Sequence, residues 1–404
     1  MAGERCCVTA GVDTHGDVHV AAALDSATGR PVGTGSFPTT PAGYGALLSW
    51  LRSFGDLEQV GVESTGSWGA GLARHLHAAG VAVIEVDRPD RKTRRFEGKS
   101  DPIDAVAAAQ AVLSGRASGK AKTKDGPVEA IRVLQVVYQG GVRDRTRAIN
   151  QFKALLVTAP ERLRANLRSL PFAAQLTRAR RLGAVDDIVD TETRLALREL
   201  AGKIGFLDAQ CGRLRIRIGE LAAQASPALV GLTGVGPHVA AQLLAAAGDN
   251  PQRLSSEAAF AKLCGACPIP ASSGKTSRHR LNRGGDRQAN NALFTMVLVR
   301  MRHDPATRAY TARRNAEGKT RKEIIRCLQR YIAREVYQAL TNPPDDLPTG
   351  AALRALRQHQ GHTLTTVANA LGTTPIRLST LEPGLVHDTR LARRCHTWLT
   401  QQAA

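Results

Sequence analysis

Short apolar runs alternate with segments of helical periodicity along the first 115 residues of the chain. The runs have the length of strands, whereas the longer segments repeat their apolar residues every three or four positions. This pattern predicts strands at 6–12, 18–24, 33–37, 60–63 and 81–86, and helices at 41–54, 68–79 and 101–113. Three strands followed by alternating helices and strands indicate an α/β domain over residues 5–125.

Residues 126–226 are predicted to be mainly helical. One segment repeats its apolar residues at alternating spacings of three and four, which is the seam of a coiled coil. The seam consists of Leu197, Leu200, Ile204, Leu207, Cys211, Leu214, Ile218 and Leu221. It either joins copies of the chain into a dimer or tetramer, or packs within the chain on residues 133–156.

Residues 227–340 form a further, mostly α region. Gly234 and Gly236 lie in a turn between two helical segments, the second of which runs to Ala247. A helix-hairpin-helix with this Gly-x-Gly turn exposes backbone N–H groups that can bind a phosphate. The alternative is a plain turn between two helices.

A basic segment rich in serine and glycine follows at 271–287, beginning with Ser272, Ser273 and Gly274. Small residues separate its charges, so that the backbone can approach a phosphate closely. The basic residues expected to contact nucleic acid are Lys275, Arg278, Arg280, Arg283 and Arg287. A charged run can also be a merely solvated face.

Residues 341–350 have the composition of a linker, and residues 351–404 are expected to form a small all-α module. A capped helix, the turn at Gly372 and a second helix starting at Thr374 resemble the helix-turn-helix of the Cro and lambda-repressor type. Arg377, Ser379 and Thr380 would then face the major groove. The alternatives are a helical cap that does not contact DNA and a decayed module, since the second helix is poor in basic residues.

The chain carries 55 Lys and Arg residues against 35 Asp and Glu residues, a formal charge of +20. This excess attracts a polyanion, and no apolar stretch approaches the roughly 20 residues of a membrane span, so nucleic acid is favoured over a membrane. The first residues contain no signal-peptide core. Seven scattered cysteines indicate free thiols, as in a reducing cytoplasm. Cys264 and Cys267 have a metal-like spacing but no second pair of ligands for zinc.

Four carboxylates stand at the ends of expected elements. Asp13 and Glu63 each end a buried strand, and Asp101 and Asp104 project from one face at the start of a helix. Acids brought together in this way repel one another unless a hard cation such as Mg²⁺ binds them. Two such ions could stabilise the attacking and leaving oxygens of a phosphodiester. Taken singly, each acid could instead be a turn residue or favour a helix N-terminus.

With these residues in hand, the chain resembles the DEDD transposases of the insertion-sequence-110 family over residues 8–340. The similar phrases are those at 11–15, 63–66, 99–105, 232–237, 273–275 and 283–287. Acids on the first strand, the fourth strand and a late helix are the layout of the RNase H-like (RuvC-like) fold. The helix-turn-helix departs from the usual plan of the family.

The resemblance implies a recombinase with a composite active site, in which Asp13, Glu63, Asp101 and Asp104 bind Mg²⁺ or Mn²⁺. Ser273 would attack the phosphodiester and form a covalent link to DNA; the adjacent Ser272 is chemically equivalent. The resemblance also implies a bridge RNA that pairs with donor and target DNA. Aromatic residues make up only 4% of the chain, which suggests few platforms for base stacking.

Three functions are compatible with these features. The first is the RNA-guided, metal-dependent serine recombinase, which belongs to transposition of an insertion sequence. The second is a metal-dependent nuclease of the Holliday-junction type that uses water as nucleophile and needs no serine. The third is a non-catalytic regulator that binds DNA through residues 351–404.

Overall fold

The computed structural model describes residues 6–86, 100–274, 279–341, 350–383 and 388–402 of the chain. The chain divides into two compact units. The first consists of Met1–Glu129 with Ala247–Ala259, and the second of Ala130–Ala246 with Phe260–Ala404. The finer domain limits expected from the sequence stay predictions.

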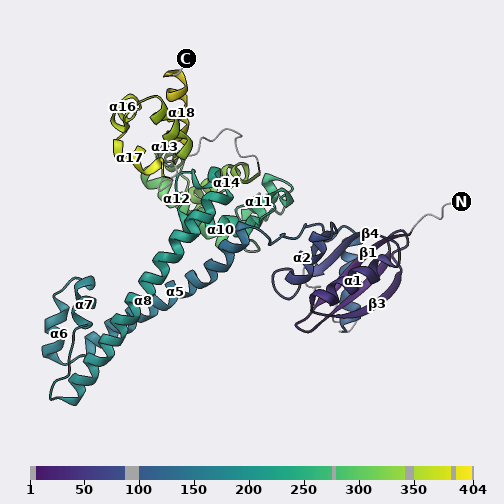
Figure 1. Cartoon of the computed structure of the whole chain (residues 1–404), viewed down its shortest axis with the longest axis horizontal. Helices are drawn as coiled ribbons and strands as arrows, with labels where there is room; N and C mark the ends of the chain where they lie inside the picture. Colours follow the sequence, from purple (N-terminus) through teal and green to yellow (C-terminus); the bar gives the residue numbers. More distant parts are fainter. Residues whose placement is uncertain (1–5, 87–99, 275–278, 342–349, 384–387, 403–404) are drawn as a thin grey trace. The chain divides into compact units, whose positions relative to one another are not determined.

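The first unit is built on a five-stranded mixed sheet (Figure 1). Its strands are β1 (Cys7–Thr14), β2 (Val18–Asp25), β3 (Pro31–Pro38), β4 (Asp56–Glu63) and β5 (Ala82–Val86), in the order β3-β2-β1-β4-β5. The first three strands pair antiparallel, whereas β1 with β4 and β4 with β5 pair parallel. The five strands expected from the sequence are thus confirmed, with small shifts at their ends.

The centre of the sheet is covered on both faces, because nearly every residue of β1 and β2 is buried. Alternate residues of the strands pack with α1 (Pro41–Arg52) and α2 (Ala70–Ala78) into the main core. Its largest members are Leu47, Leu51, Leu72 and Leu76. The remaining strand residues face α4 (Asp101–Leu113), where Ala105 packs with Val20 and Ala22 of β2. The three expected helices of this region are confirmed.

Two long helices, α5 (Pro127–Thr158) and α8 (Ile188–Ala225), run side by side in the second unit (Figure 1). The short helices α6 (Glu161–Arg168) and α7 (Phe172–Ala179) join them. Leu197 and Ile204 of the expected seam are fully buried in one cluster with Phe152 of α5. This half of the seam therefore packs within the chain, as the second interpretation expected.

Several shorter elements follow along the chain. They are α9 (Pro227–Val230), α10 (Pro237–Ala247), the 3-10 helix η1 (Pro251–Arg253), α11 (Glu257–Leu263), β6 (Ile269–Pro270), β7 (His279–Arg280), α12 (Arg287–His303), α13 (Pro305–Ala316) and α14 (Arg321–Thr341). The helix expected to end at Ala247 is α10, which ends there. The turn before it joins the four-residue helix α9, so the hairpin has only one helix of ordinary length.

The last described residues form four helices around a core of their own: α15 (Gly350–His359), α16 (Leu364–Ala370), α17 (Pro375–Leu381) and α18 (Thr389–Gln402). Thr363 caps α16 by accepting a hydrogen bond from the backbone N–H of Thr366 at 3.1 Å. Thr374 occupies the N-cap position of α17, although its side chain makes no capping hydrogen bond. None of the described helices is long and apolar enough to span a membrane.

Candidate active site and nucleic-acid contacts

The register of β1 and β4 brings Asp13 and Glu63 to one edge of the sheet. These strands run parallel, and Val12 pairs with Val62 as the last residues in register. Asp13 and Glu63 each stand one position further on, so both lie at the carboxyl end and point to the same face. Both are almost fully buried, at 6% and 4% exposure. The shared edge expected from the sequence is therefore present.

Two glycines allow α4 to pack directly on this face. Gly11 and Gly61 lie two positions before the acids and share their face of the sheet. A Cβ at Gly11 would lie 2.2 Å from the backbone nitrogen of Ala109 and 2.3 Å from the carbonyl oxygen of Ala105. With these residues of α4 over Gly11, the first turn of the helix comes to the strand ends, and Asp104 is 5% exposed there.

Asp13, His15 and Asp101 bring one ligand atom each within 4.8 Å of one another. His15 Nε2 lies 3.0 Å from an oxygen of Asp13 and 3.5 Å from an oxygen of Asp101. Glu63 and Asp104 are outside this tight group. His15 was missed as a site residue, although its place two positions after Asp13 puts it on the same side of the strand.

Burial raises the pKa of Asp13, since its carboxyl lies largely out of water. His15 opposes the rise through its charge and its hydrogen bond, whereas the charges of Asp104 and Asp101 add to it. The charges of Asp104 and Asp101 are therefore close enough to disfavour the ionised form of Asp13. Such oxygen ligands fit a hard divalent cation, which would relieve this repulsion.

The loop after Glu63 is held by polar contacts within the first unit. Ser64 adopts a positive φ of 52°, and Lys124 one of 55°; no other non-glycine residue of the described part does so. The buried Lys124 ammonium donates a hydrogen bond to the carbonyl of Thr65 at 2.5 Å. Thr14 donates to the carbonyl of Glu63 at 3.0 Å. Because such backbone is costly, these contacts stabilise the loop that positions Glu63.

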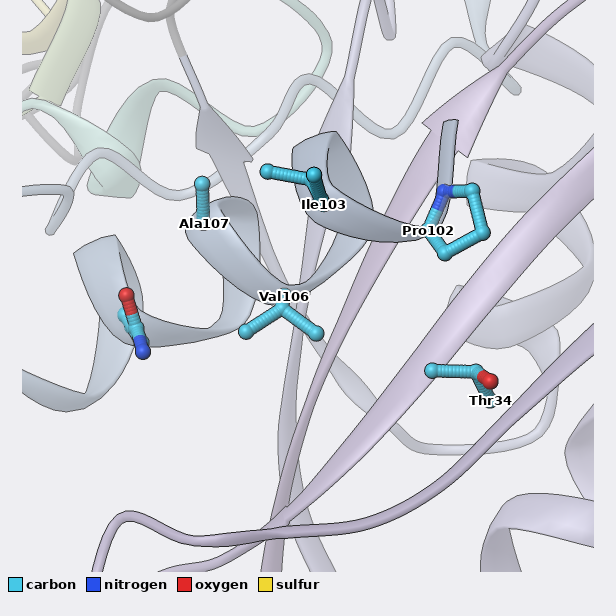
Figure 2. Close-up of a pocket in the computed structure, with 6 residues that line it drawn as sticks. Thr34, Pro102, Ile103, Val106 and Ala107 are labelled. Carbon is cyan, nitrogen blue, oxygen red and sulfur yellow. The ribbon is translucent and has the colours of Figure 1, made fainter. Parts of the chain in front are cut away.

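A hollow of about 350 Å³ lies beside the start of α4. Figure 2 shows its lining between α4 and the strand of Thr34. The remaining lining residues are Pro102, Ile103, Val106, Ala107 and Gln110. None of these residues carries a charge, so the hollow adds no ligand to the acidic group beside it.

Ser273 lies in the loop of a short β-hairpin in the second unit. Ile269 of β6 pairs with Arg280 of β7, and the loop between the strands contains both candidate serines. Ser272 and Ser273 are exposed, and Gly274 follows with a φ of 54° and nothing within 4 Å of an ideal Cβ. An exposed hydroxyl is accessible to a large substrate.

The basic residues around this hairpin are accessible where they are described. Arg280, Arg283 and Arg287 are exposed, whereas Lys275 and Arg278 lie outside the described residues. Asp286 caps α12 by accepting hydrogen bonds from two backbone N–H groups at 2.8 and 3.0 Å. Asp286 therefore serves as a helix cap. The positive charge of the neighbouring arginines stays available for a ligand.

In the glycine turn before α10, the first glycine packs closely against a neighbouring helix. Gly234 has a φ of 90°, and an ideal Cβ there would lie 3.3 Å from Cα of Met296 on α12. Arg300 of the same helix donates a hydrogen bond to the carbonyl of Thr233 at 2.8 Å. Gly236 has nothing within 4 Å of an ideal Cβ, so only this second glycine leaves open space for a ligand.

The three side chains expected to read DNA lie on or near the surface of α17. Arg377 is 63% exposed and pairs with Asp388 at 2.7 Å. Ser379 and Thr380 donate hydrogen bonds to the carbonyl of Ile376, at 2.9 and 3.0 Å. These polar groups have partners within the chain, which DNA would have to displace.

All seven cysteines are free thiols. Cys264 is fully buried, and this burial together with the charge of Asp286 raises its pKa to about 12. A thiol in this state is protonated. Within the described residues, the acidic group at Asp13 is also the sole candidate metal cluster.

Comparisons with known proteins match two parts of the chain. Residues 10–159 match a family model described as a transposase, of the DEDD type of IS110. Residues 227–312 match the model described as the transposase IS116/IS110/IS902 family.

Three relatives are similar to the chain. The insertion element IS110 43.6 kDa protein of Streptomyces coelicolor is 36% identical over 135 residues, which is 32% of this chain and 33% of the relative. The insertion element IS900 42 kDa protein of Mycobacterium paratuberculosis is 25% identical over 58% of this chain and 70% of the relative. The mini-circle putative transposase for IS117 of S. coelicolor is 24% identical over 77% of this chain and 88% of the relative. The match to the first relative thus spans a third of that protein's length.

Proposed function

The chain belongs to the IS110 family of DEDD transposases, and from this premise we propose that it is an insertion-sequence recombinase that exchanges DNA strands through a covalent serine–phosphate link. The observation that carries the proposal is the meeting of Asp13, His15 and Asp101 at the sheet edge where Glu63 is buried. A site of this kind suits the chemistry of phosphodiesters, because these carry negative charge that a bound cation can offset.

We assign the first unit to the RNase H-like (RuvC-like) fold. The order β3-β2-β1-β4-β5, with three antiparallel strands followed by two parallel ones, supports this assignment. So does the position of α4 over Gly11 and Gly61, which brings its acids to the strand ends. The helix-turn-helix assignment of the last module rests on four helices around one core, and DNA reading by Arg377 stays part of the proposal.

Asp13, Glu63, Asp101 and Asp104 would hold Mg²⁺ or Mn²⁺, which supplies positive charge to the phosphate oxygens when bound. The protein's own part is to bury Asp13, Glu63 and Asp104 and to keep the spacing of the four carboxyls. Burial excludes water from Asp13. Helix α4 keeps the spacing of Asp101 and Asp104 by fixing them on one helical turn. His15 Nε2 makes a hydrogen bond to Asp13 and lies 3.5 Å from an oxygen of Asp101.

Ser273 would act as the nucleophile. A bond forms from its Oγ to phosphorus while the bond from phosphorus to one sugar oxygen breaks. The hydroxyl gives up its proton to a base, and the leaving sugar oxygen takes up a proton. The link conserves the energy of the phosphodiester, so a hydroxyl of another strand can reverse the step and complete the exchange.

The partners we propose are donor and target DNA and a bridge-type RNA, within the bacterial cytoplasm and its nucleoid. The charge of +20 supports binding of a polyanion. Self-association into a dimer or tetramer is also part of the proposal. Its contact would have to use parts of α8 other than Leu197 and Ile204, because these are buried within the chain.

A nuclease that uses water is the second candidate, since the acids and His15 lie in one unit and need no serine. A protein–DNA adduct that survives denaturation separates the two functions. We expect wild-type protein with Mg²⁺ and its element ends to form this adduct, and Ser273→Ala to abolish it. Ser272→Ala is the matched control, which should retain it. Cleavage without any adduct in the wild type would favour the nuclease.

Two further measurements test the cation site and the guide. Asp101→Asn should impair cleavage far more than nucleic-acid binding, because the change removes charge from the acid group and leaves the basic surfaces intact; equal loss of both would indicate a structural role.

Sequencing the RNA that co-purifies with protein expressed beside its native flanking DNA should give one structured RNA from that flank. Random cellular RNA would instead shift DNA selection to the protein.

A further inference from the structure

A groove of about 740 Å³ opens in the second unit beside the serine hairpin. Arg280 of β7 lines one side, and residues of α13, α14 and the turn between them line the other. Its basic lining residues are Arg280, Arg314, Lys319, Arg326 and Arg330. The volume lies within the range of pockets that enclose small organic ligands.

The charge of the groove is strongly positive. Glu323 is the acidic residue among its described lining residues, against five basic ones. Its carboxylate accepts hydrogen bonds from the backbone N–H and the hydroxyl of Thr320, at 2.8 and 2.7 Å. These hydrogen bonds lower the pKa of Glu323, so it stays ionised but is committed to capping α14. The surplus of positive charge favours a ligand with more than one phosphate.

Tyr331 offers an aromatic surface in the same groove. The residue is 51% exposed. Tyr310 lies against it, with ring centroids 5.9 Å apart and planes at 80°. The guanidinium of Arg313 lies 5.3 Å from the centre of the Tyr310 ring. Tyr331 is thus held in place by a packed neighbour while half of its surface remains open.

We propose that this groove binds an unpaired stretch of nucleic acid, with a base stacked on Tyr331 and the flanking phosphates held by Arg280, Lys319 and Arg326. Stacking on one aromatic ring requires a base that is free of its own neighbours, and basic residues around a ring are the usual design of single-strand sites. The inference rests on the proposed function and deepens it. Arg280 ends the hairpin whose loop carries Ser273, so a strand held in the groove is led toward that loop.

The experiment uses the full chain in EDTA, so that no strand chemistry occurs. The probes are a ten-nucleotide oligo(dT), the matching oligo(U) and a ten-base-pair duplex, each labelled with a fluorophore. Tyr331→Ala should weaken single-strand binding at least about fivefold, and Tyr331→Phe should retain it, because the ring rather than the hydroxyl stacks. Arg326→Ala should also reduce the salt slope of binding by about one.

Arg334→Ala is the matched control, since Arg334 is exposed on α14 but does not line the groove. It should leave affinity for the single strand within about twofold. An oligonucleotide with 5-iodouracil should crosslink to Tyr331 under ultraviolet light. Equal binding by wild type and Tyr331→Ala, or loss in Tyr331→Phe as large as in Tyr331→Ala, would overturn the proposal. A duplex that binds as tightly as either single strand would overturn it too.

The probes also identify the source of the strand. Tighter binding of oligo(U) assigns the groove to an RNA guide, tighter binding of oligo(dT) assigns it to a displaced DNA strand, and equal affinity supports a site that accepts both. The probes are bound in EDTA, so the binding result does not depend on the serine chemistry. Failure of the adduct experiment would therefore not affect the binding result. If binding does not depend on Tyr331, the serine chemistry is still tested by the adduct.

Discussion

Gly11 has no space for a side chain, because the backbone of α4 lies directly over it. We expect Gly11→Ala to displace α4 and to lower the free energy of unfolding by roughly 3 kcal/mol, at the upper end of overpacking effects. Metal-dependent cleavage should fall with it, since Asp101 and Asp104 move with the helix. Thermal unfolding and a cleavage assay measure the two effects.

Gly45→Ala is the matched control for this prediction. Gly45 lies inside α1 and has nothing within 4 Å of an ideal Cβ. Alanine there should stabilise the chain by about 0.5–1 kcal/mol, because it restricts the unfolded chain and favours helix. A Gly11→Ala variant as stable as the wild type would contradict the close packing of α4 on β1.

His19 makes the stability of the first unit depend on pH. It is fully buried against Tyr44, and its ring nitrogens have no hydrogen-bond partner among the described residues. Burial lowers the pKa of His19 from its usual 6.5. The unfolded chain therefore binds the proton more readily, and stability that is complete above about pH 6.5 is lost as the pH falls below it.

The measurement is the free energy of unfolding between pH 7.5 and 5.5. His19→Phe, which can also stack on Tyr44, should remove up to about 1.4 kcal/mol of pH dependence per pH unit. His359→Phe changes an exposed histidine and should leave the wild-type slope. The same slope in wild type and His19→Phe would show that His19 does not carry the effect.

The sequence was sufficient to predict the position of residues whose surroundings follow from the helix or strand that carries them. Asp13 and Glu63 could be placed because each ends an apolar run, and runs of that kind become parallel strands with aligned ends. His15 could not be weighed, because its approach to Asp101 depends on where α4 lies over the sheet. Gly234 was interpreted as a phosphate contact, whereas its packing on Met296 depends on a helix 60 positions further along.

At the scale of elements, periodicity identified helices but not their partners. The seam of α8 has the spacing of a coiled coil, and that spacing is the same for a partner in the chain or in another copy. Leu197 and Ile204 are buried in one cluster with Phe152 of α5, so their partner lies within the chain. Packing within the chain was one of the two interpretations of the seam, but the spacing alone could not decide between them.

The C-terminal helices depend on one buried ion pair. Arg357 and Glu382 form two hydrogen bonds, at 2.6 and 2.8 Å, and are 9% and 6% exposed. Glu382 raises the pKa of Arg357 through its hydrogen bonds, so the guanidinium stays ionised. We expect Arg357→Met to destabilise this module by about 3–5 kcal/mol, because it leaves a buried carboxylate without its cation.

The double variant Arg357→Met with Glu382→Leu is the informative control. It removes both charges and should recover most of the loss, since well-packed apolar residues can replace a buried pair. Calorimetry of the full chain should show the change in the transition of the C-terminal helices. Equal loss in the single and double variants would mean that packing around Leu378 and Leu399, rather than charge, decides the stability.

At the scale of the whole molecule, net charge predicts how binding responds to salt. Each Lys or Arg that contacts a phosphate releases counterions, so affinity for DNA or RNA should fall steeply as salt rises. The formal charge is +20, and residues 350–404 contribute six Arg against one Glu and one Asp. Most of the surplus therefore lies elsewhere, including the groove at Tyr331 and the exposed arginines near the serine hairpin.

Deletion of residues 342–404 should consequently keep most of the non-specific affinity and most of the salt slope, measured by fluorescence anisotropy between 50 and 200 mM salt. Preference for one DNA sequence should decline if α17 reads bases, because its contacts carry sequence information rather than bulk charge. In the full chain, the substitution Arg377→Ala should then reduce the same preference. Collapse of the salt-dependent affinity on deletion would instead place the main nucleic-acid contact in the C-terminal helices, against the distribution of charge along the chain.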